Sequence, residues 1–294
     1  MSLEGLIHAG LQRRGFLAAA ASAVLAGCAA SASVPTWRAH GTDSHLLAAD
    51  HRGVEVCRDA LRSADASPEN ALNAQNIDVV NWNMKKTSLP NWREDYSRLT
   101  RGKELILLQE ASLRPDTVNA LQTVPFWSFA PGYRTGNAIT GVLTLSSVEP
   151  LTRCTFVTVE PVLRSPKATS ITQFGLEGRQ ETLLVVNLHA VNFSLGLGSY
   201  KRQFQQIAGV LEGHPGPVIL SGDLNTWREG RMETVRSLAA AFHLEPLEFA
   251  DGHRSLFFGR PLDHIYVRGL KPSAIQSTSV DSSDHNPLSV TLSL

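Results

Sequence analysis

The sequence has no excess of charge of either sign, because its 294 residues include 27 lysines and arginines and 27 aspartates and glutamates. Proteins that hold long nucleic acids by their phosphates normally carry a basic excess. The balance therefore counts against a processive or high-affinity DNA-binding protein, although a nuclease with a local basic cleft stays open. The chain also lacks repeats of solenoid length. Hydrophobic residues make up 43% of it, which is enough for the core of one large domain.

The apolar run near the N-terminus, residues 16–26, is too short to cross a bilayer. It is about half of the ~20 residues that a spanning helix needs, as in the hydrophobic region of a signal peptide. Arg13 and Arg14 precede it, as in a twin-arginine export signal, and Leu25-Ala26-Gly27-Cys28 resembles the lipobox of bacterial lipoproteins. We predict export to the periplasmic side and attachment to a bacterial membrane by a lipid on Cys28. The alternatives are an ordinary secretory signal with a coincidental cysteine, or a buried alanine-rich helix.

Three segments follow from this reading. Residues 1–27 form the signal peptide, residues 28–75 a tether and edge segment, and residues 76–294 the domain. Within the edge segment, Val54, Cys57 and Leu61 recur at helical spacing and predict a short helix inside residues 50–64.

The chain has only three cysteines. With Cys28 acylated, Cys57 and Cys154 remain as an even pair in an oxidising compartment. We predict a disulfide between them, and the alternative is two separately buried thiols.

Short β-branched runs alternate with amphipathic stretches from residue 76 onward. The run Val218-Ile219-Leu220 before Gly222 is uninterrupted, which is typical of a strand buried on both faces. Further strands are predicted at 76–83, 104–110, 136–146 (with a glycine break), 155–162, 181–189, 262–267 and 288–292, and helices near 92–99, from Pro115, near 200–211 and near 232–242. This order predicts an α/β (α+β) fold with two packed mixed sheets and helices outside them.

Polar side chains with metal-binding or acid–base chemistry follow these strands. They are Asn83, Glu110, His189, Asn192, Asp223, Asn225, Asp263, Asp284 and His285. If one edge of the sheets gathers them, so many carboxylates repel one another unless a cation neutralises them. Oxygen-rich ligation without thiolates favours Mg²⁺, with Mn²⁺ or Ca²⁺ as alternatives, over zinc. Such an ion commonly serves phosphoester chemistry.

Six short motifs in this order resemble the endonuclease/exonuclease/phosphatase superfamily. They are WNM (82–84), LLQE (107–110), NLHAVN (187–192), GDLN (222–225), LDHIY (262–266) and SDHNP (283–287). The resemblance covers residues 76–294 and implies a four-layer α/β sandwich. The superfamily includes deoxyribonucleases, AP endonucleases, neutral sphingomyelinases and inositol polyphosphate phosphatases. AP endonucleases carry a tyrosine at the position of His189, so the histidine favours the other branches.

The resemblance also implies roles. Glu110 resembles the principal metal ligand, with Asn83 beside it and Asp284 in the outer shell. His285 matches the general base that takes a proton from the attacking water, and Asp263 matches the carboxylate that orients its ring.

Four further residues complete the resemblance. Asp223 and Asn225 match residues that position the nucleophile, while His189 and Asn192 resemble donors to the phosphoryl oxygens. A loop asparagine such as Asn192 also commonly only caps a turn. We expect His264 to be structural, and expect Lys85, Lys86, Arg134 and Asn137 to be either phosphate contacts or solvated loop residues.

Three functions are compatible with these observations. The first is a metal-dependent, nuclease-like phosphodiesterase that hydrolyses its substrate with water activated by the His–Asp pair. The second is a phospholipid headgroup hydrolase of the sphingomyelinase kind, or an inositol-phosphate-type phosphatase. The sequence has no long hydrophobic hairpin that would enter lipid, and residues 195–198 are only a small candidate loop. The third is a membrane-anchored binding module without turnover. A monomer is the default expectation, because nothing in the sequence reports the oligomeric state.

Overall fold

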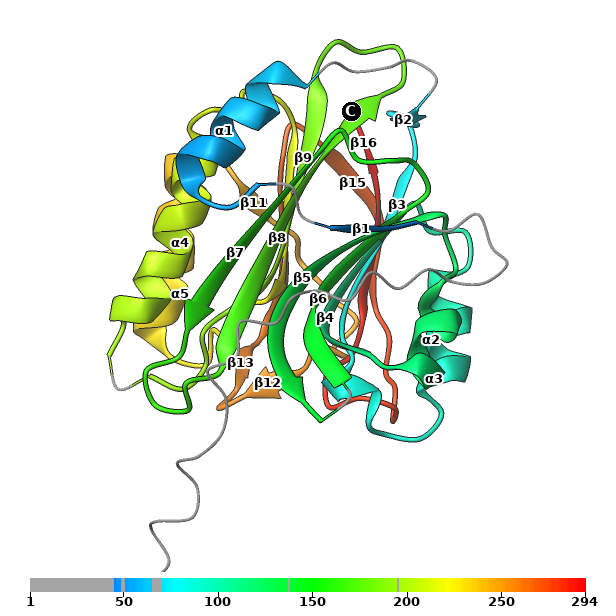
Figure 1. The fold of residues 1–294 in the computed structure, drawn as a ribbon, viewed down its shortest axis with the longest axis vertical. Coiled ribbons are helices and arrows are strands. Elements are labelled where there is room, and N and C mark those ends of the chain that lie inside the picture. Colours follow the sequence, from blue (N-terminus) through cyan, green and yellow to red (C-terminus); the bar gives the residue numbers. More distant parts are fainter. Residues whose placement is uncertain (1–44, 49–50, 65–69, 137, 195) are drawn as a thin grey trace, which may run out of the picture. The chain divides into compact units, whose positions relative to one another are not determined.

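Two mixed β-sheets form the centre of the fold (Figure 1). The structure is a computed structural model that describes residues 45–48, 51–64, 70–136, 138–194 and 196–294, all within one unit, residues 32–294. The predicted signal peptide, Cys28 and Asn137 lie outside these ranges. No helix among the described residues is long and apolar enough to cross a membrane.

The first sheet has seven strands. In spatial order they are β1 (His45–Ala48), β5 (Phe126–Thr135), β6 (Ala138–Ser146), β4 (Leu105–Leu113), β3 (Ile77–Asn83), β16 (Leu288–Ser293) and β15 (Lys271–Ser277). β3 and β4 are parallel, so their carboxyl ends reach the same edge.

The second sheet is also seven-stranded, and a small hairpin lies beside it. Its order is β11 (Glu245–Pro246), β14 (Asp263–Arg268), β10 (Val218–Asp223), β9 (Thr182–His189), β8 (Pro166–Leu176) and β2 (Ala71–Leu72), with β7 (Thr152–Val159) also paired to β8. The hairpin consists of β12 (Leu256–Phe257) and β13 (Arg260–Pro261).

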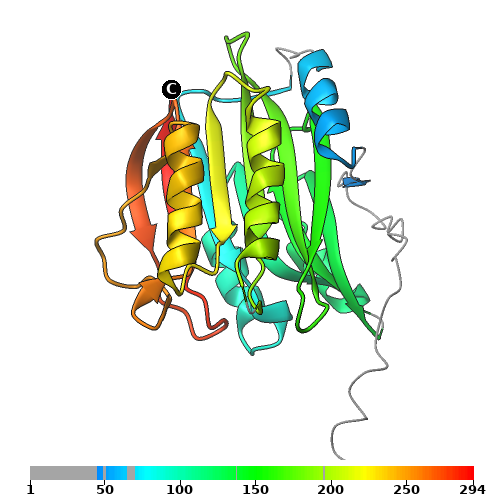
Figure 2. The same ribbon diagram turned by 90° about the vertical axis from the view of Figure 1, so that its left-hand side faces the viewer.

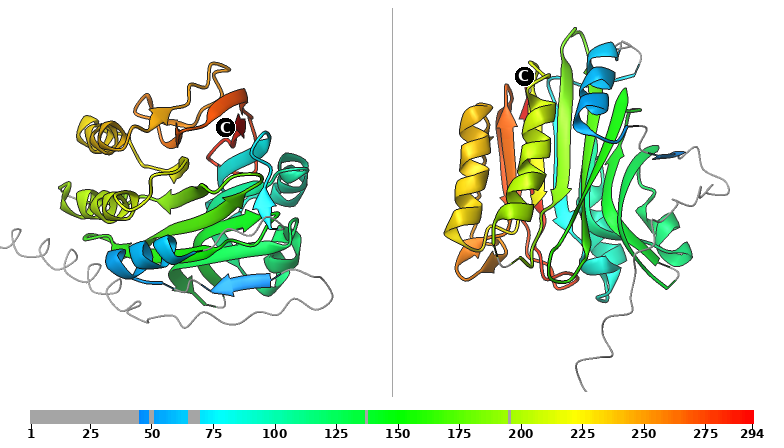
Figure 3. Two further views of the ribbon diagram at one scale, coloured as in Figure 1. Left: turned by 90° about the horizontal axis from the view of Figure 1, so that it is seen from above. Right: turned by 60° about the vertical axis from the view of Figure 1, so that its left-hand side comes forward.

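Helices cover the outer face of each sheet (Figures 2 and 3). The helices are α1 (Val54–Ser63), α4 (Gly198–Leu211) and α5 (Glu229–Ala241) on the second sheet and α2 (Trp92–Thr100) and α3 (Pro115–Leu121) on the first, besides a 3₁₀ turn η1 (Lys85–Thr87). In β10, Val218 and Leu220 pack towards α4 and α5, while Ile219 packs between the sheets. Burial on both faces explains its uninterrupted apolar run. The predicted four-layer sandwich is confirmed.

Three long strands were not predicted, namely β5, β8 and β15, and neither were the short strands β1, β2, β11, β12 and β13. β8 reads PKATSITQFGL, and its Thr169, Ser170 and Thr172 are buried although their side chains are polar. β5 contains Pro131-Gly132, a turn signal, which the sheet accommodates at a register shift between Pro131 and Tyr133.

Three predictions about strands were wrong in detail. The strand predicted at 104–110 is β4 at Leu105–Leu113, so Glu110 lies inside it rather than at its end. β6 has no glycine break, because Gly141 stays in the strand, where a Cβ would lie only 2.2 Å from the carbonyl oxygen of Ala130 in β5. Gly141 thus permits close approach of two strands. The strand predicted at 155–162 is β7 at Thr152–Val159, so it begins and ends three residues earlier.

The predicted disulfide between Cys57 and Cys154 is confirmed. It joins α1 to β7 across 97 residues of sequence, with the two Cα atoms 5.8 Å apart. The helix predicted inside residues 50–64 is also confirmed as α1, whose Cys57 and Leu61 are buried against the second sheet and α4.

Candidate functional site

The candidate site lies where strands of both sheets end on one edge. β9 and β10 run parallel, and their last residues His189 and Asp223 are register partners. Antiparallel β14 begins at the same place, with Asp263 opposite Asp223. Asn83 ends β3 in the first sheet, and its Nδ2 donates to Asp223 Oδ2 at 3.0 Å. Strand direction alone therefore brings side chains from distant parts of the chain together.

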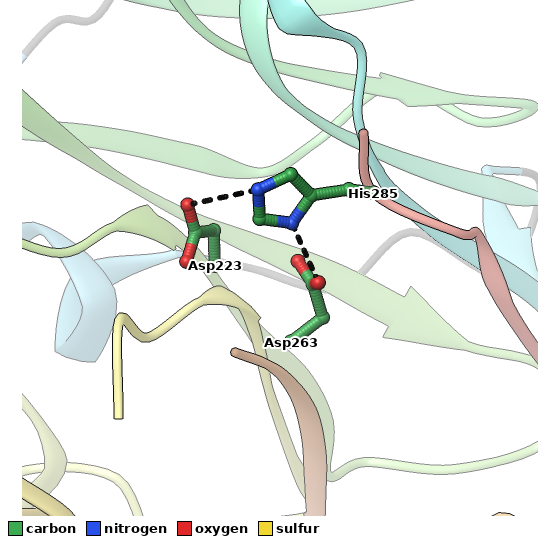
Figure 4. Close-up of side chains that lie close together, drawn as sticks. All are labelled: Asp223, Asp263 and His285. Carbon is green, nitrogen blue, oxygen red and sulfur yellow. Dashed lines mark hydrogen bonds and ion pairs between the residues drawn. The ribbon is translucent and has the colours of Figure 1, made fainter. Parts of the chain in front are cut away.

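Asp263 and His285 form a hydrogen-bonded pair at the bottom of this site (Figure 4). His285 Nδ1 lies 2.7 Å from Asp263 Oδ2, and Asp223 Oδ2 lies 4.0 Å from Nε2 on the other side of the ring. All three side chains are buried. With Nδ1–H donated to Asp263, Nε2 points at Asp223 and can accept a proton from a water held between them.

Charged neighbours shift the pKa values of His285 and Asp223. Burial opposes protonation of His285, but Asp263 and Asp223 outweigh it and raise the pKa of His285 to about 10. Burial also raises the pKa of Asp223 to about 6, an effect that His285 opposes and Asp263 reinforces. Burial and the neighbouring carboxylate of Asp263 thus disfavour the charged form of Asp223, and a cation bound beside it would oppose that shift.

This pairing gives a prediction for stability. The pKa of His285 is about 10 in the folded chain and 6.5 ordinarily, so its contribution is fully present below pH 6.5 and is lost as the pH rises through about 10. In metal-free protein, we expect the unfolding free energy of the wild type to fall by roughly 2–5 kcal/mol more between pH 6 and pH 10 than that of His285→Gln. Urea melts across this range measure it. Equal losses in both proteins would contradict the pairing.

His189 is held neutral by its surroundings. Burial, with Lys167, His285 and Lys86 nearby, keeps the pKa of His189 well below 6.5. Its Nε2 lies 2.9 Å from Lys167 Nζ, 3.4 Å from Asp223 Oδ2 and 3.9 Å from Glu110 Oε1. Because an ammonium group has no acceptor, Nε2 must accept from Lys167 and the ring proton sits on Nδ1.

Lys167 is a site residue that the sequence did not reveal. It is buried, lies 3.8 Å from the carboxylate of Glu160, and with Glu110 and His189 lines a small cavity of about 10 Å³. Its place at the start of β8 is the only signal that could have identified it, and β8 itself was not predicted. Lys167 brings a positive charge to a site otherwise lined by acids.

Two site residues and one glycine have unusual backbone conformations. Glu110 has φ 50° within a register shift of β4, and Asn225 has φ 51°. Non-glycine residues seldom adopt positive φ, and such residues often occur at functional sites. Asn225 is fixed there by bonds from its N–H to Asp223 Oδ1 and from its Nδ2 to the Ala190 carbonyl, both 3.0 Å. At Gly222 a Cβ would lie 1.9 Å from the carbonyl oxygen of Leu188, so no other residue fits.

Asp284 and the lysines of η1 lie at the more exposed side of the site. Lys85 Nζ is 3.1 Å from Asp284 Oδ2, and its N–H donates to Asn83 Oδ1 at 3.0 Å. Lys86 Nζ lies 5.7 Å from the centre of the Tyr133 ring, and Arg134 is exposed. Lys85 therefore contacts both Asn83 and Asp284.

Asn192 is fixed by residues outside the cluster. Its Oδ1 accepts from the indole N–H of Trp227 at 2.9 Å, and its N–H donates to Glu160 Oε1 at 2.6 Å. The buried Arg231 donates to the carbonyls of Val191 and Asn192. Arg231 was not foreseen, since a charged residue on an amphipathic helix normally faces solvent.

His264 has the structural surroundings that were expected. Its Nε2 lies 2.7 Å from Thr226 Oγ1 and 3.2 Å from the carbonyl of Pro261. Burial lowers the pKa of His264 to about 3, with Arg254 adding to the shift.

The first group considered for a divalent ion is the one predicted from the sequence, Glu110, Asn83 and Asp284, which carry the oxygen ligands that Mg²⁺ prefers. The group whose ligand atoms the structure brings together is Asp223, Asp263 and His285, with these atoms within 4.8 Å of one another. An ion among these three would compete with the hydrogen bond between Asp263 and His285, so we favour the first group.

Comparison with known proteins identifies relatives. The model of the Endonuclease/Exonuclease/phosphatase family matches residues 71–285. The "UPF0294 protein plu0699" of Photorhabdus laumondii is 38% identical over 213 residues, which cover 72% of this chain and 82% of that protein.

Two solved structures have the same fold. An endonuclease/exonuclease/phosphatase from Beutenbergia cavernae has a TM-score of 0.59 at 17% identity, covering 75% of this chain and 72% of that one. Sphingomyelinase C from Streptomyces griseocarneus has a TM-score of 0.52 at 17% identity, covering 74% and 99%.

Proposed function

Because this chain belongs to the endonuclease/exonuclease/phosphatase family, whose members hydrolyse phosphoesters, we propose that it is a divalent-metal-dependent phosphodiesterase. The observation that carries the proposal is the buried pair of His285 and Asp263 facing Asp223 across the ring. Paired acid–base groups of this kind have no purpose in a binding module without turnover.

The reaction proposed is in-line attack of water on phosphorus. His285 Nε2 takes the proton of the attacking water, while Asp263 fixes the ring through Nδ1 and balances the imidazolium charge. Asp223, held by Asn83 and Asn225, orients the same water. Lys167 and His189, beside Asp223 and Glu110, are proposed to contact the phosphoryl oxygens, and Asn192 is the further contact predicted from the sequence. Catalysis is then by positioning and electrostatics, without a covalent enzyme intermediate.

Glu110, Asn83 and Asp284 are the residues proposed to hold Mg²⁺, with Mn²⁺ or Ca²⁺ as alternatives. Their oxygen ligands fit a hard cation. The ion supplies positive charge to the phosphoryl group and offsets the charge that raises the pKa of His285.

Removing Glu110 is expected to remove the metal. In Glu110→Gln, we expect Mn²⁺ affinity to fall by about 10–100-fold, because a neutral amide replaces the charged ligand. Isothermal titration calorimetry of the wild type, Glu110→Gln and the exposed control Glu177→Gln measures this. If Asp263→Asn loses the ion while Glu110→Gln retains it, the ion belongs to Asp223, Asp263 and His285 instead.

Lys167 gives a second prediction. Lys167→Met is expected to lower kcat/KM by about 10²-fold, because charge is lost where the transition state gathers it. Lys167→Arg should restore part of the rate, and Lys271→Met on the exposed strand β15 should have no effect. The unfolding midpoint is measured alongside, since Glu160 loses its cationic neighbour. A rate in Lys167→Met equal to that of the wild type would remove Lys167 from the site.

The location of the protein is part of the proposal. We propose export to the periplasmic side and a lipid anchor on Cys28, supported by the sequence of residues 11–28 and by a disulfide between Cys57 and Cys154. Disulfides persist mainly in oxidising compartments. Metabolic labelling with palmitate, compared between the wild type and Cys28→Ser, tests the anchor.

A panel of phosphoesters tests the activity. Purified protein is incubated with Mg²⁺, Mn²⁺ or Ca²⁺ and with bis-p-nitrophenyl phosphate, single- and double-stranded DNA, inositol phosphates and sphingomyelin vesicles. Hydrolysis of at least one diester, stopped by EDTA, supports the proposal. No turnover of any substrate with any ion would establish the binding module.

A further inference from the structure

Exposed apolar side chains are concentrated beside the candidate site. Among the described residues, nine large hydrophobic side chains are exposed, and seven of them belong to three loops at one edge of the second sheet. We call these seven the apolar rim: Val159 at the end of β7, Val162 and Leu163 in the β7–β8 loop, Phe193 after β9, and residues 256–258 of the β12–β13 hairpin. Figures 1 and 2 place the hairpin and the β7–β8 turn at the same lower end of the sheet.

Hydrogen bonds and ring contacts hold the loops that carry the apolar rim together. Glu160 of the β7–β8 loop accepts hydrogen bonds from the N–H groups of Asn192 and Phe193. Asn192 accepts from Trp227, whose ring centre lies 6.3 Å from that of Phe257 and 6.4 Å from that of Phe258. The three loops are therefore held beside one another. His189 of the candidate site precedes Asn192 by three residues in the sequence, so the rim lies next to the site.

The hairpin tip is held out towards solvent. Phe258 is 77% exposed with φ 50°, and its ring centre is 4.4 Å from that of Phe257. This short hairpin was not foreseen, because only a long apolar hairpin was considered. Contiguous exposed apolar surface on a soluble domain marks an interaction site.

We propose that the apolar rim rests on the surface of a phospholipid bilayer and thereby presents a lipid headgroup phosphoester to the site. Stacking on nucleobases requires flat rings, whereas Val159, Val162 and Leu163 at one end of the rim are aliphatic. Near-neutral net charge also disfavours a nucleic acid. Insertion of apolar side chains below the headgroups uses aliphatic and aromatic residues alike.

Cations beside the rim suit anionic headgroups. Arg164 is exposed next to Leu163, and the Arg228 guanidinium lies 5.2 Å from the centre of the Trp227 ring. The predicted anchor at Cys28 precedes the first described strand at His45 by 17 residues. At 3.3–3.6 Å per residue, a chain of this length spans at most about 60 Å, so a lipid on Cys28 would keep the domain within that distance of the membrane.

The choice of a lipid substrate rests on the proposed function, whereas contact with the bilayer can be measured without turnover. The full chain is prepared with Cys28→Ser, so that no acyl chain contributes, and is titrated with vesicles of phosphatidylcholine and phosphatidylglycerol. In vesicles with brominated acyl chains, the fluorescence of Trp227 is expected to be quenched, and Trp227→Phe identifies its share of the signal.

Substitutions on the rim are expected to release the domain. Phe257→Ser with Phe258→Ser should lower the vesicle-dependent quenching at least ~10-fold, and Val162→Ser with Leu163→Ser should lower it too. The matched control is Val56→Ser, a 53% exposed residue on α1 away from the rim. All proteins share the apolar segment 16–26, so differences report the rim.

Two results would overturn the proposal. The first is a failure of quenching to report the rim: either the rim variants are quenched as strongly as the parent protein, or the parent protein is not quenched at all. The other is loss of binding to a single-stranded oligonucleotide in the rim variants while vesicle binding persists, which would assign the surface to nucleobases. Hydrolysis of bis-p-nitrophenyl phosphate, which is soluble and needs no bilayer, reports separately whether the proposed function holds.

Discussion

His285→Ala is expected to lower kcat/KM for a diester by about 10³-fold or more, because it removes the group proposed to take the proton from water. Asp263→Asn should cost about 10²-fold or more, since an amide cannot balance the imidazolium or fix Nδ1–H in the same way. Both variants are measured with Mg²⁺ at saturating concentration. The effects should not add in the double variant, because the two residues act through one hydrogen bond of 2.7 Å.

A control separates this loss from a general effect on the fold. His253 is exposed in the same region of the chain, and His253→Ala should keep the wild-type rate. The unfolding midpoint of each variant is recorded in parallel. If His285→Ala folds and turns over as fast as the wild type, His285 is not the base.

Loss of the disulfide is expected to have the largest effect on stability. Cys57 and Cys154 close a loop with a sequence separation of 97. In the chain-entropy view, opening a loop of this size costs about 4–5 kcal/mol, and measured losses range over about 2–5 kcal/mol. We therefore expect the double variant Cys57→Ser/Cys154→Ser to lower the free energy of unfolding by about 2–5 kcal/mol in urea melts.

Reduction of the wild type should reproduce the double variant. Dithiothreitol should lower the stability of the wild type and leave that of Cys57→Ser/Cys154→Ser unchanged, while Cys28→Ser should respond as the wild type does. Two free thiols at Cys57 and Cys154 in protein purified without reductant would contradict the bond.

Much of the site could be expected from the sequence, because its residues follow buried strands directly. Asp223 ends an apolar run, and His285 precedes β16, so both were placed at a sheet edge from pattern alone. Parallel pairing of β9 with β10 and of β3 with β4 then brings the strand ends to one edge. Nothing beyond strand direction is required for that step.

Lys167 and Arg231 could not be predicted in the same way. Lys167 is the second residue of β8, whose buried threonines and serine hide the apolar pattern of a core strand. Arg231 lies on α5, where a buried guanidinium is possible only because the carbonyls of residues 191 and 192 are within its reach. Both depend on contacts between segments far apart in the sequence.

Backbone conformation at the site is a further feature that the sequence does not predict. The positive φ of Glu110 and of Asn225 is imposed by a register shift and by hydrogen bonds to other strands, and neither residue type reveals it. Likewise, Gly141 and Gly222 are set by neighbouring strands that approach too closely for a Cβ, rather than by a turn.

The account is tested most directly by turnover itself. Full-length wild type and His285→Ala are assayed side by side on bis-p-nitrophenyl phosphate with Mg²⁺, each before and after excess EDTA. We predict release of p-nitrophenol by the wild type alone, and its loss on chelation. Equal release by both proteins, or release that EDTA leaves unchanged, would contradict the account.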